Sequence, residues 1–162
     1  MPLLAPLYNF AHWLTRDRSD AEDLVQETYV KALRGFPSFR PGTNFRAWMY
    51  RILRNTFLTS RSGLKQMVSL DDENSVVQEP AAPGDPESLL FARADEDELR
   101  RALEQLPVAH REIILLCDVE EMSYKQISEL VGIPIGTVMS RLSRARQAMR
   151  SLLREKVHGV GR

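Results

Sequence analysis

Short hydroxyl side chains and arginines gather on one face of a stretch near the C-terminal end of the sequence. Hydroxyl groups of this size reach base edges in the major groove of DNA, and guanidinium groups pair with phosphates or with guanine. Apolar residues recur at steps of three and four from Val138 to Leu152, which predicts a helix over residues 135–155. Its polar face carries Thr137, Ser140, Arg141, Ser143, Arg144 and Gln147. This face is typical of a DNA-reading helix, although a solvated basic face would have the same composition.

The residues just before this helix have the chemistry of a helix-turn-helix. Ser128 is small enough to let two helices cross closely, and Gly132, four residues later, permits the tight turn between them. Pro134 suits the entry to the following helix. This motif places its second helix in the major groove, so the two patterns together favour duplex DNA as a ligand.

A second set of arginines lies in the N-terminal part of the chain, interleaved with aromatic residues. Arg46, Tyr50 and Arg54 recur at helical spacing, and Arg51 adjoins them. Bases stack on aromatic rings and phosphates pair with guanidinium groups, so this set suits single-stranded nucleic acid. Aromatic residues at this spacing also form cores. We assign Phe45, Met49, Ile52 and Leu53 to the core and keep Trp48, Tyr50, Arg51 and Asn55 as candidates for nucleic-acid contact.

An acidic helix precedes that set. Ser19 and Glu22 fit a capping box, in which each side chain satisfies a free backbone amide of the other residue. We place Leu24 and Leu33 in the apolar stripe of this helix. Four polar residues point away from the stripe: Asp20, Asp23, Gln26 and Glu27. Either these acids stabilise the positive end of the helix dipole, or they dock on a basic protein surface.

The fold that must position these residues is predicted to be all-α. Helical spacing and capping patterns predict helices over residues 3–14, 19–35, 45–57, 86–106, 108–117, 123–130 and 135–155, with Thr43 or Asn44 as the cap of the third. Residues 62–86 are rich in Ser, Ala, Pro, Gly and acids without periodicity, which predicts a flexible acidic linker. The chain therefore divides into residues 1–61, the linker at 62–86, and residues 87–162. We expect two small helical domains, the second containing the helix-turn-helix.

The charge of the chain is balanced in total and uneven along its length. There are 22 basic and 22 acidic residues among 162, so the formal net charge is zero. Residues 1–61 carry nine basic and five acidic side chains, residues 62–106 carry four and eleven, and residues 107–162 carry nine and six. Two basic blocks flank an acidic middle. The neutral total therefore does not exclude a nucleic-acid ligand.

Several classes of protein are disfavoured by the sequence. Cys117 lies in an apolar run, which predicts a buried core thiol and fits a reducing cytoplasm. His12, His110 and His158 have no partner at ligand spacing, so we expect no metal site and no cofactor. Neither a Gly-rich phosphate loop nor a nucleophile–base pair is present, so we do not expect an enzyme. Without a long apolar run or a secretory signal, the sequence predicts a soluble cytoplasmic protein with no membrane insertion.

Three strings of residues resemble the extracytoplasmic-function (ECF) sigma factors of bacterial RNA polymerase. They are DLVQET (residues 23–28), WMYRILRN (48–55) and IPIGTVMSRLSRAR (133–146), in the family's order and with its linker. The resemblance implies a promoter-specificity subunit that binds core RNA polymerase and promoter DNA and helps to open the duplex. Thr59, Ser62 and Met139 depart from the family's pattern, which bears on the promoter sequence rather than on the class.

The resemblance also implies a role for each candidate residue. The clamp helices of the polymerase would meet Asp20, Asp23, Gln26 and Glu27. The melted −10 element would meet Phe39, Arg40, Trp48, Arg51 and Asn55, with Asn55 near a base held out of the stack. The −35 element would be read or gripped by Lys125, Thr137, Ser140, Arg141, Ser143, Arg144 and Arg146. The acidic linker would thread through the polymerase towards the RNA exit path.

Two further expectations concern partners. Residues 118–125 (DVEEMSYK) are similar to the subgroup controlled by zinc-containing anti-sigma proteins that respond to oxidants, which implies an anti-sigma protein as a partner. The alternative is a free-standing helix-turn-helix regulator that binds duplex DNA without core polymerase. Such a regulator does not need the N-terminal pair of an acidic helix and an Arg/Trp helix, so the sequence favours the sigma factor.

Overall fold

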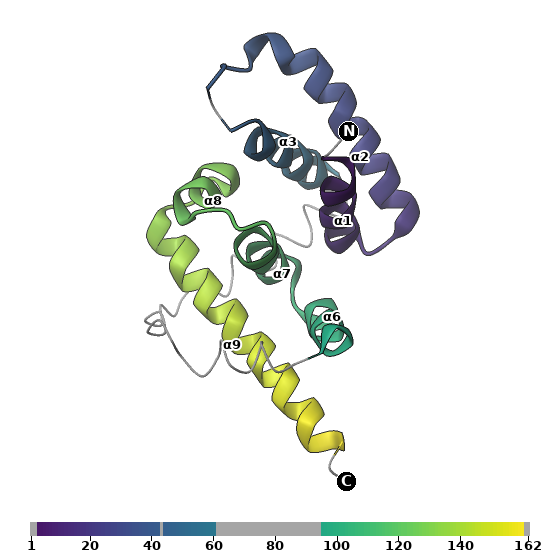
Figure 1. Cartoon of the computed structure of the whole chain (residues 1–162), viewed down its shortest axis with the longest axis vertical. Helices are drawn as coiled ribbons and strands as arrows, with labels where there is room; N and C mark the ends of the chain where they lie inside the picture. Colours follow the sequence, from purple (N-terminus) through teal and green to yellow (C-terminus); the bar gives the residue numbers. More distant parts are fainter. Residues whose placement is uncertain (1–2, 43, 61–94, 161–162) are drawn as a thin grey trace.

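The computed structural model describes residues 3–42, 44–60 and 95–160, with side chains described as far as residue 153. Every regular element in these ranges is a helix, which confirms the predicted all-α class. The helices form two domains, one from the N-terminal and one from the C-terminal part of the chain (Figure 1). The predicted linker at residues 62–86 lies outside the described residues.

The first domain consists of α1 (Leu4–Thr15), α2 (Arg18–Gly35), the 3-10 turn η1 (Phe36–Ser38) and α3 (Phe45–Thr59). The predicted capping box at the start of α2 is wrong. Asp17 is the N-cap, and its carboxylate accepts a hydrogen bond from the Asp20 backbone N–H at 2.9 Å. Asp and Ser are both favoured N-cap types, so residue preference alone does not choose between Asp17 and Ser19. Glu22 instead pairs with Arg18 on the surface of α2, at 3.4 Å.

The apolar faces of these helices close on one another to form the core of the first domain. Buried members include Leu7, Phe10, Leu14, Leu24, Val25, Met49 and Leu53. Three predictions about this core are wrong. Leu33 is 77% exposed because it lies near the end of α2, and Phe45 is 41% exposed because it begins α3. Tyr50 is fully buried, with its ring 5.2 Å from that of Phe10, so it is not available for nucleic-acid contact in this structure.

The second domain consists of α6 (Glu96–Gln105), α7 (Val108–Ile114), the π-helical turn η2 (Leu115–Val119), α8 (Tyr124–Val131) and α9 (Ile135–Val160). The start of α6 lies later than predicted, because Asp95 caps it. The Asp95 carboxylate accepts from the Glu98 backbone N–H at 2.7 Å, and Glu98 completes a capping box. The predicted earlier part of this helix, from Pro86, lies outside the described residues.

The predicted helix-turn-helix is confirmed in α8, α9 and the turn between them. Gly132 adopts φ 78°, the left-handed conformation that glycine tolerates without strain. Its backbone N–H donates to the Ser128 carbonyl at 2.9 Å, and the Ser128 hydroxyl donates to the carbonyl of Ile133. At the start of α8, Ser123 and Gln126 form a capping box. Turn and cap together fix the angle at which α9 leaves α8.

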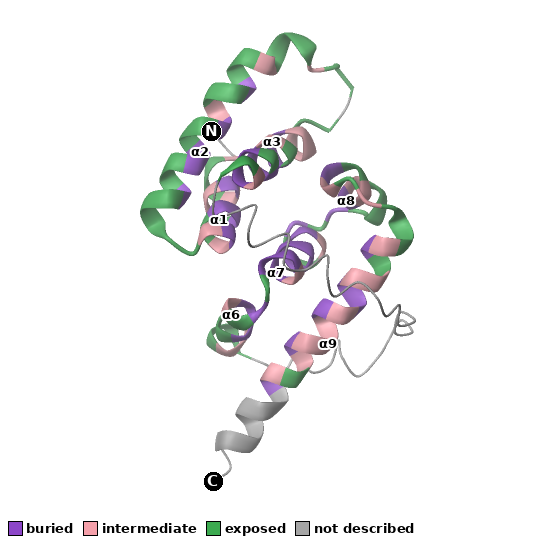
Figure 2. Cartoon of the chain, turned by 180° about the vertical axis from the view of Figure 1, so that it is seen from behind, coloured by how far each residue is buried: buried purple, intermediate pink, exposed green. Residues whose placement is uncertain are grey.

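The two domains pack directly against each other. Helix α3 contacts α8, and α1 contacts α7 (Figure 1). Buried apolar residues of both domains belong to one continuous core, and Figure 2 shows buried segments on α1 in the first domain and on α7 and α9 in the second. This arrangement places α3, which carries the Arg/Trp set, against the second domain. Among the described helices, none is both long and apolar enough to cross a membrane.

Candidate nucleic-acid and polymerase interfaces

One exposed face of α2 carries acidic and amide side chains in its first half and apolar side chains near its C-terminal end. The predicted docking residues Asp20, Asp23, Gln26 and Glu27 are all exposed there. Val30, 45% exposed, and Leu33 continue this face towards the end of the helix. The sequence prediction missed both residues, because it placed Leu33 in the apolar stripe and assigned Val30 to neither face. Steps of three and four counted forward from Asp23 would have placed Val30 on the polar face instead.

Four aromatic rings gather where the segment after α2 meets α3. The centroid of the Phe39 ring lies 6.0 Å from that of Phe36, 5.4 Å from that of Phe45 and 5.0 Å from that of Trp48. The predicted residues Phe39 and Trp48 are therefore in contact, and Phe36 (58% exposed) and Phe45 join them. We call these four residues the aromatic cluster. Phe39 and Trp48 are half-buried, and rings that keep part of their surface exposed can stack on unpaired bases.

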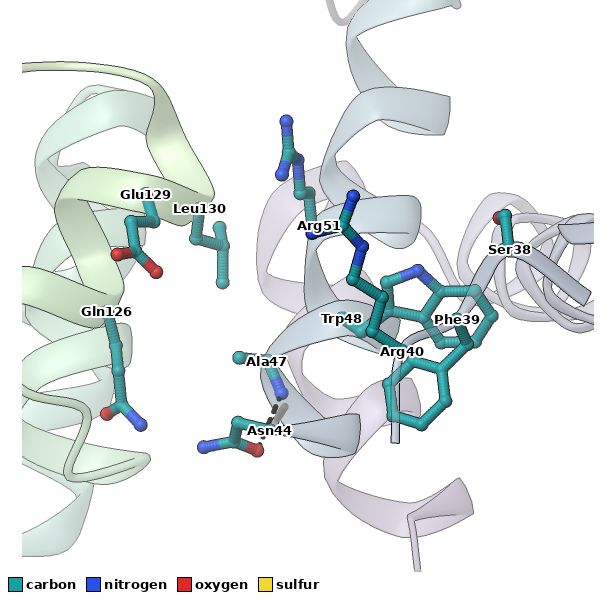
Figure 3. Close-up of a pocket in the computed structure, with 10 residues that line it drawn as sticks. All are labelled: Ser38, Phe39, Arg40, Asn44, Ala47, Trp48, Arg51, Gln126, Glu129 and Leu130. Carbon is teal, nitrogen blue, oxygen red and sulfur yellow. Dashed lines mark hydrogen bonds between the residues drawn. The ribbon is translucent and has the colours of Figure 1, made fainter. Parts of the chain in front are cut away.

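A hollow of about 290 Å³ lies between the aromatic cluster and α8 (Figure 3). Its first-domain wall includes the predicted residues Phe39, Arg40, Trp48 and Arg51, and its second-domain wall is made by Gln126, Glu129 and Leu130 of α8. Glu129 reaches from α8 towards the side of α3 that carries Arg51 (Figure 3). Asn55 is exposed one turn further along α3 and does not line the hollow. Four of the five predicted −10 residues thus share one site.

A second, apolar hollow of about 640 Å³ lies beside Trp48 and Phe45. Its lining is completed by Leu3, Tyr29, Ala32, Leu33, Phe36, Asn44, Arg46 and Met49. Trp48 and Asn44 line both hollows, so the two recesses adjoin each other at the start of α3. The apolar recess also joins the aromatic cluster to the exposed end of α2, because Leu33 and Phe36 belong to it.

Two arginines of α3 are held by acidic residues of the second domain. Arg54 Nε donates to both carboxylate oxygens of Glu112, at 3.0 and 2.9 Å, and Arg46 forms an ion pair with Glu120. Burial raises the pKa of Glu112, and the positive charges of Arg54 and Arg141 oppose that rise. Sequence reasoning missed both pairs because the partners are 58 and 74 positions apart and no local pattern links them.

The predicted −35 residues occupy different environments in the second domain. Lys125 is exposed on α8, and Thr137, Ser140, Arg141 and Arg144 are half-buried along α9. Ser143 is buried beside Leu142, so the apolar stripe of α9 is wider than predicted, and its hydroxyl has no hydrogen-bond partner. Arg146 forms an ion pair with Asp118 of η2 at 2.7 Å. Ile135 and Met139, which the sequence prediction did not include among the −35 residues, are exposed on the first turns of α9.

The cysteine is less buried than predicted. Cys117 lies half-buried in η2, and a nitrogen of the Arg146 guanidinium is 3.7 Å from its sulfur. Burial raises the pKa of the Cys117 thiol, the charge of Asp118 raises it further, and Arg146 opposes both effects. In the described part of the chain, no group of three His, Cys, Asp or Glu side chains is placed to share a metal ion.

Each of the two domains matches a known protein family. The family described as Sigma-70 region 2 matches residues 2–65, and the family described as Sigma-70, region 4 matches residues 96–149. The ECF RNA polymerase sigma factor EcfG of Rhodopseudomonas palustris is 35% identical over 144 residues, which cover 89% of this chain and 77% of that protein. The chain belongs to the ECF sigma factors. The resemblance predicted from three short strings is confirmed at the level of the family.

Other ECF sigma factors and solved structures show the same relationship. The sigma factor SigE of Mycolicibacterium smegmatis is 37% identical over 149 residues, 91% of this chain but 57% of that longer protein. The sigma factor RpoE of Bartonella quintana, solved in complex with the anti-sigma factor NepR, has a TM-score of 0.70 and 35% identity, over 94% of this chain and 92% of that one. CnrH, solved with the cytosolic domain of CnrY, has a TM-score of 0.61 and 26% identity, over 95% and 84% of the two chains.

Proposed function

We propose that this ECF sigma factor binds core RNA polymerase, recognises a −10 and a −35 promoter element, and promotes DNA opening at the start of transcription. The observation that carries this proposal is that each domain presents an arginine-bearing helix, α3 in the first and α9 in the second. The aromatic cluster beside α3 suits a melted strand, whereas the helix-turn-helix suits a duplex. In this proposal the polymerase performs the nucleotidyl transfer, and the chain contributes no catalytic group. The complex would act in the cytoplasm.

The α2 face is the proposed docking surface for core polymerase. Carboxylates repel DNA phosphates and attract basic protein surfaces, so this face suits a protein partner. Val30 and Leu33 add apolar area that docking would remove from water. The proposed contact residues are Asp20, Asp23, Gln26, Glu27, Val30 and Leu33.

The −10 element is proposed to bind at α3 and the aromatic cluster. Phe39 and Trp48 would stack on unpaired bases, and Arg40 and Arg51 would pair with phosphates. Asn55, exposed on the same helix, would contact the base held out of the stack. For Asn55→Ala we expect promoter binding by the holoenzyme to survive better than strand opening, measured by gel shift and by permanganate reactivity of thymines. Equal loss of both would indicate a structural role for Asn55.

The −35 element is proposed to bind at α9. Thr137, Ser140, Arg141 and Arg144 lie along this helix, and Lys125 of α8 adds a positive charge beside it. Arg146 contributes by fixing α9 to η2 through its ion pair with Asp118, and the buried Ser143 contributes through packing of the helix. In terms of the whole chain, residues 1–61 would form the −10 and polymerase-binding domain and residues 87–162 the −35 domain. Residues 62–86 would thread through the polymerase.

Reconstituted transcription tests the proposal. Purified chain is added to core polymerase with a pool of promoter fragments, and we expect specific transcripts that depend on both. The double variant Asp23→Lys, Glu27→Lys is expected to abolish them, because two charges on the α2 face are reversed. Glu96→Lys, exposed on α6, reverses a charge elsewhere and is expected to leave transcription intact. Tight binding of duplex DNA by the free chain, with no core-dependent transcript, would establish the free-standing regulator instead.

An anti-sigma protein of the zinc-binding type is the proposed regulator. Support comes from the similarity of residues 118–125 to that subgroup, and from two structural relatives, one solved with the anti-sigma factor NepR and one with the cytosolic domain of CnrY. When a candidate anti-sigma protein is added to the transcription assay, we expect it to inhibit transcription. A zinc chelator or an oxidant should relieve that inhibition. Inhibition that neither treatment changes would contradict the zinc-binding type and leave an anti-sigma protein of another class.

A further inference from the structure

Two large apolar side chains stay exposed at the start of α9. Ile135 is 45% exposed and Met139 is 37% exposed, although Val138 and Leu142, which begin the apolar stripe of the same helix, are buried. Figure 2 shows the start of α9, beside α8, as an exposed segment. Because Ile135 and Met139 are four positions apart on a helix, they lie next to each other on its surface. Together they form a small apolar patch, which we call the apolar pair.

A glycine leaves the surface beside the apolar pair open. Gly136 follows Ile135 and lies one turn before Met139, and a side chain there would meet no other part of the described chain within 4 Å. Its backbone is helical and not left-handed, so neither conformation nor packing within the described chain requires a glycine. Glycine lowers helix stability relative to alanine, but it lets the backbone approach a ligand closely. The first turn of α9 is therefore suited to close contact with another molecule.

The motif that contains the apolar pair favours DNA as that molecule. In a helix-turn-helix, the N-terminal residues of the second helix contact base edges in the major groove. Arg141 and Arg144 follow on α9 and Lys125 lies on α8, so positive side chains lie on both helices of the motif. Positive charge attracts a phosphate backbone, which favours nucleic acid over a neutral protein surface as the partner.

Among the groups on base edges, the methyl group of thymine matches the apolar pair. The other functional groups in the major groove donate or accept hydrogen bonds, and an apolar side chain that covers one of them leaves it without a partner. The neighbouring Ser140 hydroxyl donates to the Thr137 carbonyl at 3.2 Å, so towards a base it can only accept. Adenine presents an amino donor in the same base pair as the thymine methyl group. An A·T pair therefore suits both the apolar pair and Ser140.

We propose that Ile135 and Met139 determine part of the specificity for the −35 element, by packing on the 5-methyl groups of thymines in one or two of its A·T pairs. The inference rests on the proposed function and names the bases that the same α9 site selects. Met139 is also a position at which the sequence departs from the ECF pattern. The preference that it confers therefore belongs to this chain and not to the family as a whole.

Removal of single methyl groups from the DNA tests the contact. Wild-type holoenzyme first selects promoter fragments from a pool that is randomised over the −35 element, and anisotropy then gives its affinity for a selected fragment. Each thymine of the −35 element, on either strand, is replaced in turn by uracil, which lacks only the 5-methyl group. We expect uracil at one or two positions to weaken binding about fourfold, which corresponds to the burial of one carbon.

The double variant Ile135→Ala, Met139→Ala shows whether these side chains receive the methyl groups. We expect its holoenzyme to bind the thymine and uracil fragments equally at those positions. The matched control is Val119→Ala, which removes apolar surface from a 53% exposed position of η2 and should keep the loss on uracil substitution. Alanine is a strong helix former, so the double variant should remain helical, which circular dichroism checks.

Met139→Arg gives a second readout, which does not depend on the alanine variant. Arginine pairs with O6 and N7 of guanine, so a repeated selection with this variant should replace one A·T pair of the −35 element by a G·C pair. An unchanged base preference would overturn the placement of Met139 at a base edge.

The uracil series separates failure of this inference from failure of the proposed function. A selected −35 element without A·T pairs, or wild-type holoenzyme that is insensitive to uracil throughout the element, would overturn the inference. A loss on uracil substitution that the double alanine variant retains would also overturn it. These results leave the proposed function intact, because the holoenzyme still selects a −35 element. Failure to select any −35 sequence, with no core-dependent transcript, would instead overturn the proposed function and the inference with it.

Discussion

Arg144 is the candidate whose substitution most directly tests the proposed −35 site. It lies half-buried on α9, on the helix that follows the turn of the helix-turn-helix. We expect Arg144→Ala to weaken holoenzyme binding to the −35 element by about 1–3 kcal/mol, the scale of one good base contact. Anisotropy titrations on matched and mutated −35 duplexes measure this loss. A loss equal for both duplexes would assign Arg144 to a phosphate, and no loss would remove it from the site.

The sequence predicted correctly that several polar residues are exposed. Asp23, Glu27 and Arg51 are exposed as expected, since polar side chains remain in water unless a partner compensates their burial. The sequence could not show that Glu112 and Arg54 are buried together. Each has the composition of a surface residue, and only the meeting of two distant helices supplies its partner.

Cys117 offers a prediction that follows from its pKa. The thiolate is the reactive form, and burial together with Asp118 raises the pKa of the thiol, so less thiolate is present at a given pH. At pH 8 we expect iodoacetamide to alkylate the native chain more slowly than the urea-unfolded chain, because a raised pKa leaves a smaller fraction of the Cys117 thiol ionised. The difference should shrink as the pH rises above the raised pKa. Equal rates by mass spectrometry at pH 8 would contradict this environment.

At the scale of the helix, the structure and the sequence prediction differ in which residue caps the start of α2. Asp17→Ala removes the observed N-cap hydrogen bond and is expected to lower the free energy of unfolding by about 0.5–2 kcal/mol. Ser19→Ala, which would break the predicted capping box, is expected to have almost no effect. Chemical denaturation of the two variants measures both. A larger effect at Ser19 than at Asp17 would restore the predicted box.

Elements whose ends carry special backbone chemistry were the most predictable. Gly132 marks the end of α8 because its left-handed conformation suits glycine, and Asn44 caps α3 as one of two predicted residues. The start of α6 was missed because the prediction chose Asp85 as the N-cap, whereas Asp95, which has the same side chain, caps α6. The π-helical turn η2 was missed because it has no sequence signature of its own; it appeared as the end of a longer helix.

At the scale of the whole molecule, the shared core predicts how the chain unfolds. Domains of about 60 residues are marginally stable alone. Buried residues of both domains form one cluster, and two ion pairs, Arg54–Glu112 and Arg46–Glu120, also join the domains. We therefore expect a single cooperative thermal transition, with equal calorimetric and van't Hoff enthalpies. Two separated transitions in the wild-type chain would show that the domains are independent.

The division into two helical domains could be read from the sequence, but their packing could not. A linker of more than twenty residues is compatible with many arrangements of the domains it joins. Net charge by block did not predict the contact either, since residues 1–61 and residues 107–162 each carry a basic excess. In the structure, individual acids at Glu112 and Glu120 within the second block meet individual arginines of α3.

The buried pair of Arg54 and Glu112 limits how freely this sigma factor can exchange parts with its relatives. A chimaera that joins the first domain of this chain to a second domain without an acid at the position of Glu112 leaves the Arg54 guanidinium without that acceptor. Each domain could fold by itself, but the Arg54 charge would then be buried at the domain contact without a carboxylate partner. Designers of orthogonal promoter systems should transplant both helices, α3 and α7, as a unit.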